Sequence, residues 1–154
     1  MKKNSAFLAL GLLGLACLGA VAQQKSDEKP ATRTLKVKLN YTGTAGTVDQ
    51  NHKIFVFVFD TPDFMQSQNA MPISSGQAGA KDETVTLAAL ASSPVYVVAA
   101  FDPKGAYDGM SGPPPSGSSI GLYSKTPMTP EPVKIEAGKT AQIDLPFDDS
   151  MKMP

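Results

Sequence analysis

The residues best suited to chemistry lie in one short segment, Asp102-Pro103-Lys104-Gly105-Ala106-Tyr107-Asp108. Asp102 and Asp108 stand at its first and seventh positions, and calcium takes six to eight oxygen ligands from carboxylates and backbone carbonyls. Lys104, however, stands where a further acidic or amide ligand is usual, and its charge opposes a cation. The order of Asp, Pro and Gly at the first, second and fourth positions is typical of a type I turn. We therefore expect a turn here, with calcium binding by Asp102 and Asp108 as the alternative.

His52 is the only histidine of the chain. A general base needs a nucleophile and an orienting acid beside it, and no motif next to His52 in the sequence supplies them. A zinc site needs three or four ligands, which one histidine and one cysteine do not provide. We expect no catalytic residue, no cofactor and no resident metal, so the protein is predicted not to be an enzyme. A small secreted hydrolase that uses loop carboxylates is the enzymatic alternative.

Alternating apolar and polar residues predict the elements that would position these side chains. Residues 35–41, 53–60, 83–87 and 95–101 are expected to be strands, with short strands near residues 73 and 121–124. Residues 133–136 and 142–145 flank Gly138 and predict a closing hairpin. Thr61 and Pro62 favour the start of a short helix that ends near Asn69.

Two of the expected strands are apolar on both faces, which normally requires a cover on each face. In residues 53–60, Phe55, Phe57 and Phe59 point to the side opposite the β-branched residues between them. Residues 103–132 hold seven of the 13 prolines and are expected to form a packed loop or a mobile flap. Leu122 and Tyr123 of this loop would cover the phenylalanines, unless a partner molecule does so.

These elements predict an all-β fold: a single antiparallel Greek-key β-sandwich of about seven strands with one long Pro/Gly-rich loop. The sandwich domain is expected to span residues 34–147, after a flexible leader at residues 23–33. Residues 148–154 are expected to be a polar tail, whose Met151 and Met153 have no ligand role.

The first 22 residues are typical of a secretory signal peptide. Lys2 and Lys3 precede an uncharged apolar run, and the sequence Ala20-Val21-Ala22 predicts cleavage after Ala22. The run is short for a membrane span of about 20 residues, so we expect no membrane span in the mature chain. Cys17 lies in a poor context for lipid attachment. The predicted location is the periplasm or the extracellular medium.

The mature chain would carry a net charge of −2, because cleavage removes two lysines from a chain with 14 basic and 14 acidic residues. No run of basic residues is present, which argues against nucleic acid as a partner. The sequence gives no indication of an oligomeric state.

Several short motifs resemble those of prealbumin-like sandwich domains of bacterial envelope proteins, including the carboxypeptidase-regulatory-like domains and collagen-adhesin B-type repeats. The motifs are Phe59-Asp60, Glu83-Thr84-Val85-Thr86-Leu87, the run from Val95 to Asp102, and the closing pattern from Val133 to Leu145. The resemblance implies a non-catalytic spacer, adhesion module or carbohydrate-contacting accessory. We therefore expect an exported module with a binding or structural role at the cell envelope and an envelope protein or carbohydrate as partner. The predicted contact residues are Asp102, Tyr107, Asp108, Leu122 and Tyr123.

Overall fold

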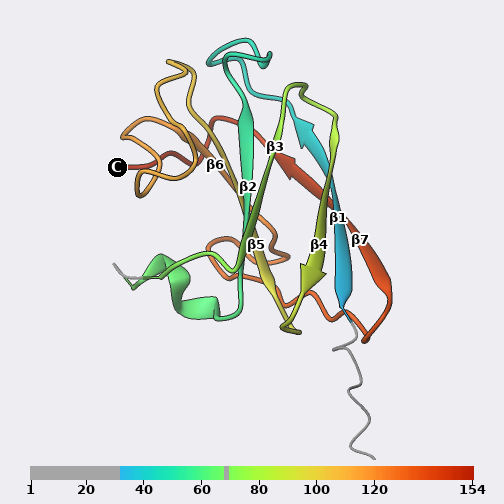
Figure 1. Ribbon diagram of the computed structural model, residues 1–154. Helices are drawn as coiled ribbons and strands as arrows, with labels where there is room; N and C mark the ends of the chain where they lie inside the picture. The colour runs from blue at the N-terminus through green and yellow to red at the C-terminus, as the bar shows by residue number, and fades with distance from the viewer. Residues whose placement is uncertain (1–31, 68–69) are drawn as a thin grey trace, which may run out of the picture.

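The computed structural model describes residues 32–67 and 70–154, which fold into two β-sheets that lie face to face (Figure 1). The predicted signal peptide, its cleavage site at Ala22, Cys17 and the leader as far as residue 31 lie outside the described residues. The strands are β1 (Arg33–Tyr41), β2 (Ile54–Phe59), β3 (Ser74–Ala78), β4 (Thr84–Leu90), β5 (Tyr96–Phe101), β6 (Ser119–Leu122) and β7 (Thr140–Phe147). Within the same ranges, no helix is long and apolar enough to cross a membrane.

One sheet has the strand order β4-β1-β7, and the other has the order β3-β2-β5-β6. The all-β class and the two-layer arrangement of seven strands confirm the prediction. The prediction of a wholly antiparallel fold is wrong, because β7 pairs with β1 in parallel from Thr34–Thr140 to Tyr41–Phe147. The remaining strand pairs are antiparallel.

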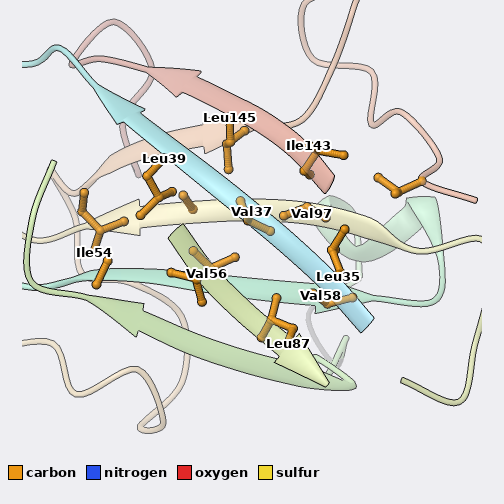
Figure 2. Close-up of a cluster of buried hydrophobic side chains, with 14 of the residues drawn as sticks. Leu35, Val37, Leu39, Ile54, Val56, Val58, Leu87, Val97, Ile143 and Leu145 are labelled. Atoms are coloured by element: carbon orange, nitrogen blue, oxygen red, sulfur yellow. The ribbon is translucent and has the colours of Figure 1, made fainter. Parts of the chain in front are cut away.

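The main core lies between the two sheets (Figure 2). Every second residue of β1 points inward, so Leu35, Val37 and Leu39 are fully buried. Val56 and Val58 of β2 meet them from the opposite sheet. Burial of each such side chain contributes roughly 1.5–3 kcal/mol to folding, which suits a chain that the sequence predicts to fold without disulfides.

The predicted closing hairpin is wrong. The turn at its tip is present, since Gly138 has φ +73° and Lys139 N–H donates to the Glu136 carbonyl at 3.0 Å. The arms of the turn have different partners, however: β7 pairs with β1, whereas Val133 exchanges two backbone hydrogen bonds with Val95, of 2.8 and 3.0 Å. The segment before the turn therefore follows the edge of one sheet, and β7 completes the other.

Several boundaries also differ from the prediction, among them the end of β4, which is Leu90 and not residue 87. The helix is a 3-10 turn, η1 (Pro62–Met65), whose N-cap is Thr61 as expected. The short strand expected near residue 73 is β3, which runs from Ser74 to Ala78. β6 begins at Ser119, two residues before the predicted strand, and divides the segment 103–132 into two shorter loops.

Pro146 does not end the last strand, as the sequence suggested, but lies within β7 opposite Asn40. Proline is tolerated there because β7 is the edge strand of its sheet. The missing N–H of Pro146 therefore removes no hydrogen bond between strands.

The segment predicted to be a polar tail packs on the fold. Ile120 N–H donates to the Met151 carbonyl at 2.8 Å, and Gly117 N–H donates to the Met153 carbonyl at 3.0 Å. Met153 N–H donates in return to the Ser118 carbonyl at 2.9 Å. Residues 151–153 thus extend the sheet beyond β6 as a short antiparallel addition.

Candidate binding surface

A second apolar cluster lies on the outer face of the sheet β3-β2-β5-β6, away from the main core. It forms because β2 is apolar at every position: Ile54, Val56 and Val58 fill the core, so the three phenylalanines between them must face outward. Phe57 and Phe59 are nevertheless buried. The cover that the sequence required for this face is therefore present within the chain.

Two loops supply that cover. Phe64 of η1 stacks on Phe59 with ring centroids 4.4 Å apart, and Tyr107 meets the edge of Phe55 at 5.2 Å. Tyr107 also lies 6.2 Å from Phe57. Such aromatic pairs contribute about 0.5–1.5 kcal/mol each beyond the burial of their area. The loops after β2 and after β5 are thus fixed to the sheet by aromatic contacts.

Asp102 holds the second loop in shape. Its carboxylate is only 4% exposed and accepts hydrogen bonds from the backbone N–H groups of Lys104, Ala106 and Tyr107, at 2.9, 2.9 and 3.1 Å. Gly105 N–H donates to the Asp102 carbonyl at 3.1 Å, which closes the predicted turn. The turn is confirmed, and its effect is to place Tyr107 over the phenylalanines.

Asp108 organises the tip of the same loop. It accepts hydrogen bonds from the N–H groups of Met110 and Ser111, both at 2.8 Å, and from the Ser111 hydroxyl at 2.5 Å. These bonds lower the pKa of Asp108 to about 2, and the bond from the Ser111 hydroxyl has the largest effect. Asp102 and Asp108 therefore direct their oxygens to donors of their own loop. In the described ranges no three His, Cys, Asp or Glu side chains gather as a metal site would require, and calcium binding stays a prediction.

Gly109 allows this loop to approach the sheet closely. Its φ is +76°, and a Cβ at this position would lie 2.4 Å from a ring carbon of Phe55. A side chain would therefore strain the backbone and push the loop away from the aromatic cluster.

The predicted contact residues at the end of β6, Leu122 and the following Tyr123, lie on two sides of the sheet. Leu122 pairs with Val98, which belongs to the outer cluster, so it shares that face with Tyr107. Tyr123 instead packs against the main core. The expectation that Tyr123 covers the phenylalanines is wrong, because the alternation of a strand places neighbouring residues on opposite faces.

The tips of the two covering loops expose apolar side chains. Met65, Met71, Ile73 and Met110 are 42%, 79%, 40% and 88% exposed. Together with the outer aromatic cluster they form what we call the outer apolar surface. Sequence analysis did not identify these residues, since the loops carry turn residues and no periodicity that would tell an exposed methionine from a buried one.

His52 lies beside this surface but does not belong to a catalytic constellation. Its Nδ1 is 3.0 Å from Asp49 Oδ1, which also accepts from the N–H groups of Asn51 and His52. These bonds lower the pKa of Asp49. Asp49 and His52 thus form a self-contained turn.

Residues 117–121, Gly-Ser-Ser-Ile-Gly, match the Gly-x-Ser-x-Gly pattern of serine hydrolases, a match that lies far from His52 in the sequence. That pattern requires the serine on a sharp turn between a strand and a helix. Ser119 lies instead inside β6, is fully buried, and donates to Asp149 Oδ1 at 2.6 Å. The structural context therefore does not support a nucleophile at Ser119.

Asp149 accepts more hydrogen bonds than any other carboxylate of the described residues, and no motif in the sequence points to it. Besides Ser119 it accepts from the Tyr41 hydroxyl at 2.6 Å, Thr44 N–H at 2.6 Å and Ala45 N–H at 2.9 Å. Burial alone would raise its pKa, but these hydrogen bonds outweigh burial and hold the pKa of Asp149 well below its usual value. Burial and the same interaction raise the pKa of Tyr41 to about 12.

Comparisons with known proteins add little. No family model and no curated protein matches the chain. A solved structure, the pilus-presented adhesin Spy0125 (Cpa), is similar over 78% of this chain, with 10% sequence identity and a TM-score of 0.33. The match covers 27% of the adhesin chain. The function of the present chain is therefore inferred from its own residues.

Proposed function

We propose that the protein is an exported, non-enzymatic β-sandwich that binds a partner protein at the bacterial cell envelope through its outer apolar surface. The observation that carries this proposal is the exposure of Met65, Met71, Ile73 and Met110 around an aromatic cluster that already has an internal cover. The two loops cover the same face of the sheet, and exposed apolar side chains that share a face are typical of interaction sites. Methionine suits such a role, because its flexible thioether adapts to different partner surfaces.

Export is inferred from the signal-peptide pattern that ends at Ala22, which places the mature chain in the periplasm or outside the cell. The two-sheet architecture supports a prealbumin-like or carboxypeptidase-regulatory-like family and a Greek-key connectivity, which are part of the proposal. Protein from the native host should begin at Gln23 when its N-terminus is sequenced. An uncleaved N-terminus would contradict the export proposal.

A protein partner fits better than a carbohydrate. Phe57 and Phe59 are buried beneath the loops, so their rings do not offer the open faces on which a sugar would stack. Asp60, Asp63 and Asp108 are exposed on the covering loops. A partner with an apolar centre and a basic margin would complement both features.

The test uses a photo-crosslinking amino acid at position 71 or 110 of the chain expressed in its native host. The control position is Lys36, which is exposed on the outer face of the other sheet. Adducts to one protein from positions 71 and 110, absent from position 36, would support the proposal. Polysaccharide adducts would identify the carbohydrate alternative, and equal labelling at all positions would refute a specific surface.

A variant series gives an independent check. Met65, Met71 and Met110 are replaced by serine together, and Met128→Ser serves as a matched control, since Met128 is 63% exposed but lies outside the two covering loops. The triple variant should lose the crosslinked partner while the control keeps it.

A further inference from the structure

The last residues of the chain occupy a site that is built entirely by other elements. The donors to Asp149 are Tyr41 at the end of β1, Thr44 and Ala45 in the loop after it, and Ser119 of β6. Lys152, at 4.0 Å from Asp149 Oδ1, is the one basic group of the segment itself that approaches the carboxylate. The hydrogen-bond donors for this carboxylate therefore all lie outside the segment that carries it.

Backbone pairing provides the second contact. The edge of β6 receives residues 151–153 through the three hydrogen bonds described above, and Ser119 and Lys152 form a β-bridge. This is the geometry in which an extended peptide adds to a sheet edge. Next to it lies a shallow pocket of about 310 Å³, which Thr42 and residues of β6 and β7 line together with Asp148, Ser150 and Met151 of the segment itself.

The segment joins the fold at a residue that the core holds. Phe147 is buried and packs against Tyr41 with ring centroids 4.8 Å apart. Ser118, whose buried Oγ has no hydrogen-bond partner among the described residues, shows that the segment does not satisfy every polar atom of this edge.

We propose that the edge of β6 and the donors around Asp149 form a peptide-binding site for an extended segment with a carboxylate at the Asp149 position. In the isolated chain, residues 148–154 occupy the site in cis. The partner that fits it in trans is the same segment of a second copy, because its side chains and backbone already match the site. When two copies exchange their segments, each site keeps the same contacts. The fraction of exchanged molecules therefore depends on the protein concentration, compared with the effective concentration of the chain's own tethered segment. That effective concentration is on the order of millimolar for a short link.

The test uses the full mature chain with Asp149→Ala, which weakens its own segment, and a fluorescent peptide with the sequence of residues 148–154. The peptide should bind the folded variant with a dissociation constant below about 1 mM. Replacing the aspartate at position 149 of the peptide by asparagine should weaken binding by about 10-fold, since the charge that strengthens its hydrogen bonds is lost. The matched control peptide carries Asp148→Asn and should bind as the unmodified peptide does, because Asp148 accepts only from Ser150 N–H within its own segment. Equal binding of a scrambled peptide, or no binding, overturns the proposal.

A second measurement uses the unaltered chain, in case the variant does not fold. Excess unlabelled peptide at about 5 mM should release the tethered segment. In the NMR spectrum of the isotope-labelled chain, the amide signals of Met151 and Met153 should move to unfolded positions, while those of Gly117 and Ile120 remain at hydrogen-bonded positions. Unchanged signals for Met151 and Met153 would refute exchange. This outcome is independent of the outer apolar surface, which lies on other residues.

Discussion

Replacing Asp149 should destabilise the fold by an amount that depends on what replaces it. Alanine removes the acceptor of four hydrogen bonds of 2.6–2.9 Å. Hydrogen bonds to a charged group contribute about 1.5–3 kcal/mol each, although they do not add. The Asp149 side chain is 24% exposed, so water replaces part of what is lost. We therefore expect Asp149→Ala to lower the free energy of unfolding by about 3 kcal/mol.

Asparagine should cost less, about 1.5 kcal/mol. Its oxygen can still accept from the fixed N–H groups of Thr44 and Ala45, and its amide can donate to the hydroxyls of Tyr41 and Ser119, which rotate to accept. Only the charge is lost. Asp148→Ala is the matched control and should change stability by less than about 0.5 kcal/mol.

Urea denaturation at pH 7 and at pH 3 provides the assay. The folded state holds the pKa of Asp149 below its usual value, so its contribution is present above the unfolded pKa of about 4 and is lost as the pH falls. The difference in stability between the unaltered chain and Asp149→Asn should therefore shrink at acid pH. A difference that stays constant from pH 7 to pH 3, or equal effects of Asp148→Ala and Asp149→Ala, would refute the assigned role.

Further predictions concern Tyr41 and the loop that contains Tyr107. The pKa of Tyr41 is raised to about 12, so the contribution of its neutral hydroxyl to stability is present below pH 10 and should be lost between about pH 10 and 12. The melting temperature of the unaltered chain should fall over this range, and that of Tyr41→Phe should not show this fall. Tyr107→Ala should lower the free energy of unfolding by about 2–3 kcal/mol through lost contact with Phe55, measured by urea denaturation; an unchanged midpoint would show that the loop does not pack there. Gly109→Ala should destabilise by at least about 1 kcal/mol, because it adds both backbone strain and a clash with Phe55, and crystallography of the variant should show the loop displaced. Asp108 uses its oxygens within its own loop, so the chain should melt at the same temperature with calcium and with chelator; a calcium-dependent rise that Asp108→Ala abolishes would establish the metal site instead.

The alternation of residues was sufficient to predict that neighbouring side chains of β2 and β5 lie on opposite faces, but not which face lies against the main core. Phe55 and Val56 point to opposite sides as expected, because a strand allows no other arrangement. The need for a cover on the phenylalanine face also followed from the sequence. The identity of that cover did not: Tyr107 and Phe64 provide it rather than Tyr123, since loop conformation depends on side chain to backbone hydrogen bonds such as those of Asp102.

Strand pairing was the part that the sequence did not determine. Gly138 makes the predicted turn, yet a turn fixes only the local direction of the chain. The partner of β7 is β1, about a hundred residues away, and parallel pairing of this kind leaves no local pattern. Asp149 was missed for the same reason, because its donors come from distant parts of the chain and Asp148 beside it has the same chemical character.

The parallel ladder between β1 and β7 has a mechanical consequence. The chain enters β1 at Arg33 and leaves β7 at Phe147, and the register places these two points at opposite ends of the ladder. Tension applied between Arg33 and Phe147 thus loads the hydrogen bonds of the ladder along the strand axis, in shear, so that they resist together instead of opening one after another. A pull beyond Phe147 would first detach residues 151–153 from β6 and would then meet this ladder.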